Sequence, residues 1–394
     1  MNEAGSEYLE RARGLGPRIA AAANDIERRR ELPEELVAAL AGAGLFHLLA
    51  PRSLGGAELR PAEFARTVEE VAKHDASTAR CVGQACGCTM SAAYLEPAAA
   101  REVFGPPRGI VAWGPPGAGG EAREAAGGFR LSGSWSFASG SHHATWLGAH
   151  VPILAADGTP KRRAHDGGMV MRTLLFPKTS VAMTDIWRVV GLRGTGSDQY
   201  TAADLFVPEA FTVLRDSAVK PREAGTLYKF SSSNVYSAGF AGVALGVAQS
   251  TRDAFIELAR DKIPRGAKRT LRDNNVVQAQ VSQATAKLET ARAFLYGALD
   301  EIWDAVDRPG GAVTLDHNAT IRLASTWAIH QAKDVVDTLY HAAGATAIFE
   351  ENPFERRFRD IHTVIQQFQG RQAHFETVGQ ILLGLEPGAG MFTF

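Results

Sequence analysis

The 394-residue sequence has few of the features that mark membrane, secreted or nucleic-acid-binding proteins. It contains no apolar run near the roughly 20 residues that cross a bilayer, and its polar first residues lack a signal-peptide pattern. Lysine and arginine number 42 against 43 aspartate and glutamate residues, so no positive excess attracts a nucleic acid or an anionic membrane. We therefore expect a soluble, cytoplasmic protein with neither kind of partner.

Cysteine is also scarce. Cys81, Cys86 and Cys88 lie together in one stretch of small, mostly apolar residues. An odd number of cysteines in such a stretch fits reduced thiols in a reducing compartment. A metal site would need a histidine or a fourth cysteine at ligand spacing, and this stretch has neither. We predict no metal centre.

Three regions of different pattern follow one another along the chain. Residues 1–106 place apolar positions three and four apart, which predicts an N-terminal helical domain. Residues 107–215 consist of short β-branched and aromatic segments between Gly, Pro and Asp, which is typical of a central β-barrel or sandwich.

Residues 216–394 contain long rows of regularly spaced apolar residues, called seams here, which predict a C-terminal four-helix bundle. Apolar residues from Val277 to Ile302 recur every three or four positions and predict one helix of about 30 residues. Further helices are expected over residues 315–343, 354–369 and 371–385. The fold class is thus α+β and multidomain, with a β-domain between two helical domains.

One short stretch, SWSFASGSHHATW from Ser134 to Trp146, combines aromatic residues, small hydroxyls, a glycine and two histidines. The strand that enters it alternates, and this alternation predicts one shared face for Phe129, Leu131, Gly133, Trp135 and Phe137. Because Trp135 shares that face with Leu131, we expect its ring to fill the core of the β-domain.

In its order of domains the chain resembles the acyl-CoA dehydrogenase superfamily, whose members hold a flavin between the β-domain and the bundle. The motifs that carry the resemblance are LPEELVAALAGAGLFHLLAP followed by two glycines, WSFASG, WRVVGLRGTGSDQYTAADLFVPE and HAAGATAIFEENPFERRFRDIHT. The W-x-F-x-S-G element is similar to that of the flavin monooxygenase branch. That branch takes reduced flavin from a separate reductase and uses it to activate oxygen.

The resemblance implies a set of partners and contacts. FAD or FMN, supplied in reduced form by a flavin reductase, would act with O2 on a small organic substrate, in a homotetramer built as a dimer of dimers. A planar flavin needs an aromatic wall and hydrogen-bonding groups at its N5 and carbonyl edge. Phe137 is assigned to the wall, Ser139 to that edge, Gly140 to the turn, and Trp113 to the pocket lining.

Five further cofactor contacts are implied by the resemblance: Thr195, Ser197, Arg265, His341 and Gly344. The run GLRGTGS, which holds the first two, lacks the Gly-Lys-Ser/Thr ending of a P-loop and is expected to be a β-domain turn near the flavin. Arg265 lies in the basic run PRGAKRTLR, which either neutralises a flavin phosphate, across a subunit boundary, or is simply solvated.

The residues needed for ordinary dehydrogenation are missing. The catalytic glutamate of a dehydrogenase follows the late R-D pair, but here that segment reads IHTVIQQFQGRQ, and an amide cannot act as a carboxylate base. The R-x-x-F-G element that grips the FAD diphosphate is also absent.

Monooxygenase relatives place one histidine late in the bundle and another on an early helix. In this chain Gln366 or Gln367 occupies the late position, and Cys86 or Cys88 the early one.

The leading hypothesis is a two-component flavin monooxygenase with Ser139, His143 and Gln367 as candidate catalytic residues. His142 and His143 follow the Ser-Gly turn, and an exposed loop pair is the alternative interpretation for both. Two other functions stay open. One is an acyl-CoA dehydrogenase with a relocated base, for which the candidates are Glu350, Glu351 and Glu376. The other is a non-catalytic flavin-binding or assembly protein.

Overall fold

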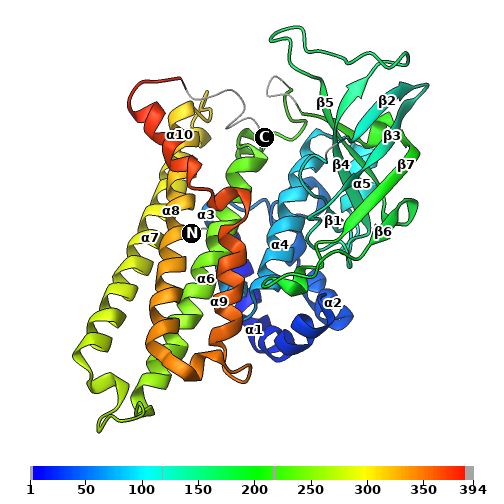
Figure 1. Ribbon diagram of the computed structural model, residues 1–394. Coiled ribbons are helices and arrows are strands. Elements are labelled where there is room, and N and C mark those ends of the chain that lie inside the picture. Colours follow the sequence, from blue (N-terminus) through cyan, green and yellow to red (C-terminus); the bar gives the residue numbers. More distant parts are fainter. Residues whose placement is uncertain (1–2, 118, 216–218, 387–394) are drawn as a thin grey trace.

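The computed structural model describes residues 3–117, 119–215 and 219–386, and its parts follow the predicted order (Figure 1). The N-terminal part comprises α1 (Glu3–Arg29), α2 (Glu34–Gly42), α3 (Pro61–Ala72), α4 (Ala76–Thr89) and α5 (Pro97–Phe104). The C-terminal part comprises α6 (Ser232–Asp261), α7 (Asn275–Asp307), α8 (Leu315–Ala343), α9 (Phe354–Ile365) and α10 (Ala373–Leu382). The predicted α+β architecture is confirmed.

The long helices of the bundle follow their apolar seams. In α7 the predicted seam is buried at Val277, Ala284, Leu288, Ala291, Leu295, Ala298 and Ile302. Asn274 starts this helix because its side chain accepts a hydrogen bond from the Val276 amide at 2.9 Å. The last two helices are shorter than predicted. They are separated by a 3₁₀ turn, Phe368–Gly370, where a Cβ on Gly370 would lie 2.5 Å from the Ile365 carbonyl oxygen.

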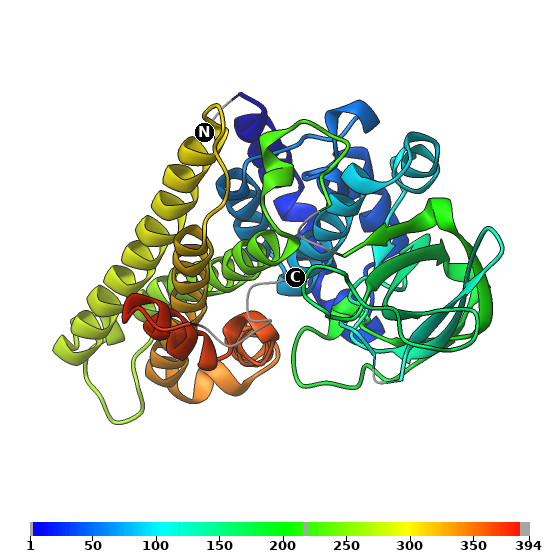
Figure 2. The same cartoon turned by 90° about the horizontal axis from the view of Figure 1, so that it is seen from above.

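The β-domain is one curved eight-stranded sheet in the order β6-β7-β3-β2-β4-β5-β8, with β1 paired to β4 (Figure 2). Its strands are β1 (Val111–Ala112), β2 (Glu121–Ala125), β3 (Gly128–Trp135), β4 (Trp146–Leu154), β5 (Met171–Pro177), β6 (Ala182–Thr184), β7 (Gln199–Pro208) and β8 (Thr212–Leu214). Trp135 lies opposite Tyr200 in the β3–β7 register, and the two rings stack at 5.5 Å. Trp135 is fully buried, so the prediction that it fills the core is confirmed.

Helix α4 lies between the bundle and the β-domain (Figures 1 and 2). It contacts α6 on one side, and β1 and the 193–195 turn on the other. All of its residues are buried, including the three free cysteines, and burial raises the pKa of each thiol to about 12. These thiols are therefore protonated and unreactive at neutral pH. Within the described residues, no helix is long and apolar enough to cross a membrane.

Candidate functional site

The aromatic strand ends in a strained turn that exposes Phe137. The strand's alternation predicts Trp135 and Phe137 on one face, but Trp135 is fully buried whereas Phe137 is 59% exposed. This prediction was wrong because β3 ends at Trp135, and Phe137 takes a left-handed backbone conformation with φ of +65°. Such a conformation costs a non-glycine residue about 1 kcal/mol or more, and it is found mostly where function requires it.

Trp187 completes an aromatic wall, a name we use for Phe137 and Trp187. The two rings meet edge to face, with centroids 5.9 Å apart. The backbone at Trp187 is fixed by Asp198, whose Oδ1 accepts hydrogen bonds from the amides of Ile186 (3.0 Å) and Trp187 (3.1 Å). The other carboxylate oxygen of Asp198 lies 2.7 Å from Nε2 of His142. The wall therefore combines an exposed Phe137 ring with a half-buried Trp187 whose backbone is held by Asp198.

The structure brings together two predicted site segments that lie far apart in the sequence. Gly140, with φ of +84°, donates its amide hydrogen to the Thr195 carbonyl at 2.8 Å. The Ser141 hydroxyl donates to the Gly196 carbonyl at 2.8 Å. Only glycine adopts the first conformation without strain. The Ser-Gly turn is thereby held against the GLRGTGS loop.

Three buried hydroxyls form a chain at this junction, which we call the hydroxyl relay: Thr195, Ser197 and Ser139. The Thr195 hydroxyl donates to the Leu192 carbonyl at 2.9 Å, because a carbonyl can only accept. With the Thr195 hydrogen assigned to that carbonyl, Ser197, 2.7 Å from Thr195, donates to it, and Ser139, 2.9 Å from Ser197, donates in turn. Each hydroxyl has one hydrogen, so Ser139 Oγ is left as a hydrogen-bond acceptor.

The R-D pair of α9 clamps the segment that leads into the relay. Arg359 donates to the Val190 carbonyl at 2.7 Å, and Asp360 Oδ1 accepts from the Leu192 amide at 2.6 Å. A Cβ on Gly191 would lie 2.2 Å from the Arg359 carbonyl oxygen, so the loop approaches the helix too closely for any side chain. The bundle thus positions the β-domain half of the site.

Replacing Asp360 by asparagine is expected to flatten the pH dependence of stability. Burial raises the pKa of Asp360 to about 7, whereas an unfolded aspartate titrates near its ordinary value. Between these values the folded state binds more protons, so the free energy of unfolding falls as pH rises, by at most about 1.4 kcal/mol per pH unit. Asparagine keeps the Leu192 contact but cannot titrate. Urea unfolding at pH 5 and pH 7 measures the difference, and parallel profiles for the two proteins would contradict this assignment.

Two predicted site residues, Trp113 and His143, pack against other rings. Trp113 is buried among residues of α5 and the sheet, and its ring packs edge-on against His150 at 5.0 Å. His143 is buried against Phe46, with ring centroids 5.5 Å apart, and burial lowers its pKa to about 3. His143 is therefore neutral at physiological pH, and its neighbour His142 is the one tied to Asp198.

The contacts of Gln367, Cys86 and Cys88 show where each of these side chains points. Gln367 lies half-buried after α9, and its side-chain oxygen caps the 3₁₀ turn by accepting from the Gln369 amide at 2.6 Å. Cys86 points away, because its thiol donates to the Leu45 carbonyl at 3.2 Å. Cys88 lies 3.6 Å from the hydroxyl of Tyr236 on α6. Of the two cysteines, Cys88 therefore faces the contact between α4 and α6.

The remaining predicted cofactor residues gather at the other end of the bundle. Arg265 is exposed in the connection from α6 to α7, and His341 and Gly344 lie at the end of α8. Lys262 links the two segments, since its ammonium group donates to the Ala343 carbonyl and, at 2.6 Å, to the Thr346 hydroxyl. Figures 1 and 2 both show the α6–α7 connection pointing away from the β-domain.

Other candidate features do not form a site. Each of the alternative bases Glu350, Glu351 and Glu376 is exposed to solvent.

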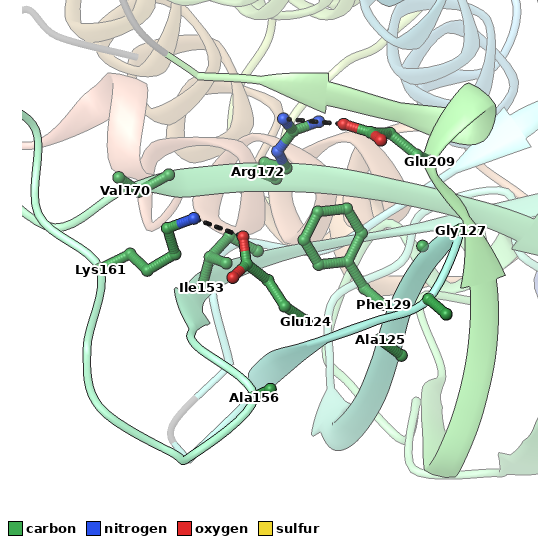
Figure 3. Close-up of a pocket in the computed structure, with 12 residues that line it drawn as sticks. Glu124, Ala125, Gly127, Phe129, Ile153, Ala156, Lys161, Val170, Arg172 and Glu209 are labelled. Atoms are coloured by element: carbon green, nitrogen blue, oxygen red, sulfur yellow. Dashed lines mark hydrogen bonds and ion pairs between the residues drawn. The ribbon is translucent and has the colours of Figure 1, made fainter.

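A surface hollow of about 380 Å³ lies on the β-domain, where Figure 3 shows Lys161 pointing toward Glu124, and Arg172 toward Glu209. These charges pair with one another, and the hollow includes the first residues of β3, whereas the Ser-Gly turn follows the last. We assign it no function.

The aromatic wall and the relay fit the ring of a flavin. The exposed Phe137 ring, braced by Trp187, provides apolar surface, and Ser139, whose amide donates to the Phe137 carbonyl at 3.0 Å, provides a hydrogen-bond acceptor. Reduced flavin carries a hydrogen on N5 and can donate to such an acceptor, whereas oxidised flavin cannot.

The sequence analysis did not identify Trp187 or Asp198 as site residues, although both lie in the WRVVGLRGTGSDQY motif. An acidic residue beside a Gly-Ser turn is the signal that could have indicated Asp198.

Comparisons with known proteins show the family and the fold. Family models for the acyl-CoA dehydrogenase N-terminal and C-terminal domains match residues 11–101 and 238–372. Indole-3-acetate monooxygenase of Pseudomonas putida is 28% identical over 381 residues, which cover 95% of this chain and 93% of that protein. The oxygenase subunit HsaA of a flavin-dependent monooxygenase of Mycobacterium tuberculosis is 28% identical over 389 residues, or 96% and 95% of the two chains.

A solved structure gives the same result. XiaF from a Streptomyces species, in complex with FADH2 and glycerol, is 26% identical and superposes with a TM-score of 0.89 over 98% of this chain and 97% of that one. The two family models match the N-terminal and C-terminal helical parts of the described fold. The chain belongs to the acyl-CoA dehydrogenase family, and the relatives named above are flavin-dependent monooxygenases or their subunits.

Proposed function

We propose that the protein is the oxygenase component of a two-component system that receives reduced FAD or FMN from a separate reductase. Bound reduced flavin supplies two electrons, so that one atom of O2 enters the substrate and the other leaves as water. The observation that carries the proposal is the direction of the hydroxyl relay, which leaves Ser139 as an acceptor beside the aromatic wall. The wall would keep water from one face of the ring.

The substrate we propose is a small aromatic molecule, in line with the indole compound named for the Pseudomonas relative. Dehydrogenation of a thioester is less well supported, since Glu350, Glu351 and Glu376 are all exposed. A purely structural role leaves the strained, exposed Phe137 without a purpose. His143 and Gln367 stay predictions as catalytic residues; His143 packs against Phe46, and Gln367 caps the Phe368–Gly370 turn.

We further propose a homotetramer in which the basic α6–α7 connection serves a neighbouring subunit's flavin. Arg265, Lys268 and Arg269 are exposed there, at the end of the bundle that points away from this chain's own β-domain. Exposed apolar side chains on α7 and α8, Phe294 and Trp327, support contact between copies. Light scattering gives the molar mass in solution, and a monomer would contradict this assembly.

Isotope labelling tests the proposed activity. The purified protein, reduced FAD or FMN from any generic flavin reductase, and a panel of small aromatic compounds are incubated under ¹⁸O2. A hydroxylated product heavier by one ¹⁸O atom is expected. Hydrogen peroxide as the sole product from every compound would count against the proposal. Anaerobic bleaching of bound oxidised flavin by acyl-CoA thioesters would instead favour the dehydrogenase.

A further inference from the structure

Helix α4 presents one buried cation, Arg80, to a small cavity at its contact with α6. The cavity is lined by Arg80, Gly83, Tyr236, Gly239, Phe240 and Val243. Arg80 is 9% exposed, and its guanidinium lies over the Phe240 ring, 4.2 Å from the ring centroid. A Cβ added to Gly83 would meet no atom within 4 Å, so this glycine leaves open space beside the guanidinium.

Arg80 has only neutral partners among the residues that the structure describes. Its one side-chain hydrogen bond there is to Gln84 Oε1 at 2.6 Å, and no carboxylate reaches it. A guanidinium has five N–H donors, and burial without an opposite charge is costly. Buried charges are normally paired or bind a ligand. The unmatched charge therefore points to an anion from outside the chain.

The hydrogen bonds of Gln84 connect this cation to Trp113 and to Tyr236 on α6. Gln84 Oε1 accepts from Arg80, while Nε2 donates to the Trp113 carbonyl at 3.0 Å and lies 3.3 Å from the Tyr236 hydroxyl. Cys81, the next residue on α4, has its sulfur 4.0 Å from the Thr195 carbonyl, at the relay. Arg80 thus lies on the helix that borders the relay.

The size of the cavity limits what can enter it. Its volume is about 10 Å³, which accommodates about one oxygen-sized group and excludes a ring. A ligand held by Arg80 must therefore place a small anionic group in the cavity and keep the rest of the molecule outside. Phe240 and Tyr236 line the cavity with aromatic surface. Their rings suit a substrate whose anionic group is attached to an apolar, aromatic body.

We propose that Arg80 binds the carboxylate of the substrate, so that the enzyme acts on aromatic acids rather than on neutral aromatic compounds. This inference rests on the proposed function and adds the substrate class to it. Gln84 positions the guanidinium, and Gly83 provides the space for a carboxylate oxygen. The cavity admits one carboxylate oxygen, to which the guanidinium would donate a charge-assisted hydrogen bond.

Calorimetric binding of matched acids and amides tests this site. The probes are phenylacetate with phenylacetamide, and indole-3-acetate with indole-3-acetamide, titrated into the protein–flavin complex without oxygen. We expect wild-type protein to bind at least one acid about tenfold or more tighter than its amide. Arg80→Gln should weaken binding of that acid by about 10- to 100-fold and leave the amide within about threefold.

Two further variants make the outcome decisive. Arg66→Gln is the matched control, because Arg66 also lies over an aromatic ring, that of Tyr296, but on α3 and outside the site. It should bind acids like wild type. If Arg80→Gln does not fold, Arg80→Lys must bind the acid more weakly than wild type and still prefer it to the amide. Equal binding of acid and amide by wild type, or equal weakening of both by Arg80 variants, overturns the proposal. Because no oxygen is used, failure of the ¹⁸O2 experiment leaves this result unaffected.

Discussion

Ser139→Ala is expected to abolish a preference of the protein for reduced over oxidised flavin. In the wild-type protein the relay commits the Ser139 hydrogen to Ser197, so Ser139 Oγ can accept from N5–H of reduced flavin but cannot donate to N5 of oxidised flavin. One hydrogen bond gained and one buried acceptor left unpaired predict a preference of about 10- to 100-fold. Anaerobic and aerobic titrations of FAD and FMN measure the two dissociation constants.

Ser197→Ala makes the complementary test. Without Ser197 the Ser139 hydroxyl can rotate and donate, so binding of oxidised flavin should become tighter while binding of reduced flavin changes little. Ser141→Ala is the matched control, since it removes a hydroxyl from the same turn that donates to the Gly196 carbonyl outside the relay. If Ser139→Ala keeps the wild-type ratio of the two affinities, the relay does not select the redox state.

Phe137→Gly is expected to weaken flavin binding without lowering the stability of the protein. Phe137 is 59% exposed and has a φ of +65°, so its ring contributes little burial while its backbone is strained. Glycine relieves this strain, which is worth about 1 kcal/mol, and the variant should be at least as stable as wild type. Loss of the aromatic plate should weaken flavin binding by about tenfold or more.

Phe137→Ala and Phe206→Ala complete the comparison. Alanine removes the same ring but keeps the strained backbone, so Phe137→Ala should lose flavin affinity and gain no stability. Phe206, on β7, is another exposed phenylalanine of the β-domain, and its replacement should leave flavin affinity unchanged. Thermal unfolding without flavin gives stability, and anaerobic titration gives affinity. A Phe137→Gly variant with normal affinity would remove Phe137 from the wall.

Local patterns predicted the elements of this fold well. The α7 seam, the central strands and the burial of Trp135 follow from periodicities of three to four and of two, which depend on neighbouring residues alone. The Ser-Gly turn and the GLRGTGS loop could both be assigned to the site from their motifs. Their pairing could not, because Ser139 and Ser197 are 58 residues apart and meet only through the sheet.

Positions within the site were predicted less well where a local pattern ends. Alternation placed Phe137 with Trp135, because the sequence does not reveal that the backbone turns left-handed after β3. Trp113 and His143 stay predictions as site residues, and the structure shows that their rings pack against His150 and Phe46. Arg80 was overlooked, although an arginine within a run of small apolar residues is a signal that deserves weight.

The sequence by itself determined the secondary structure, the order of the three parts and the family to which the chain belongs, since each is encoded in short segments. Only the tertiary structure decided the direction of the hydroxyl relay, the exposure of Phe137 and the missing partner of Arg80. Hydrogen-bond direction and charge pairing depend on which groups from distant segments lie within about 3 Å of each other. Sequence spacing does not contain that distance.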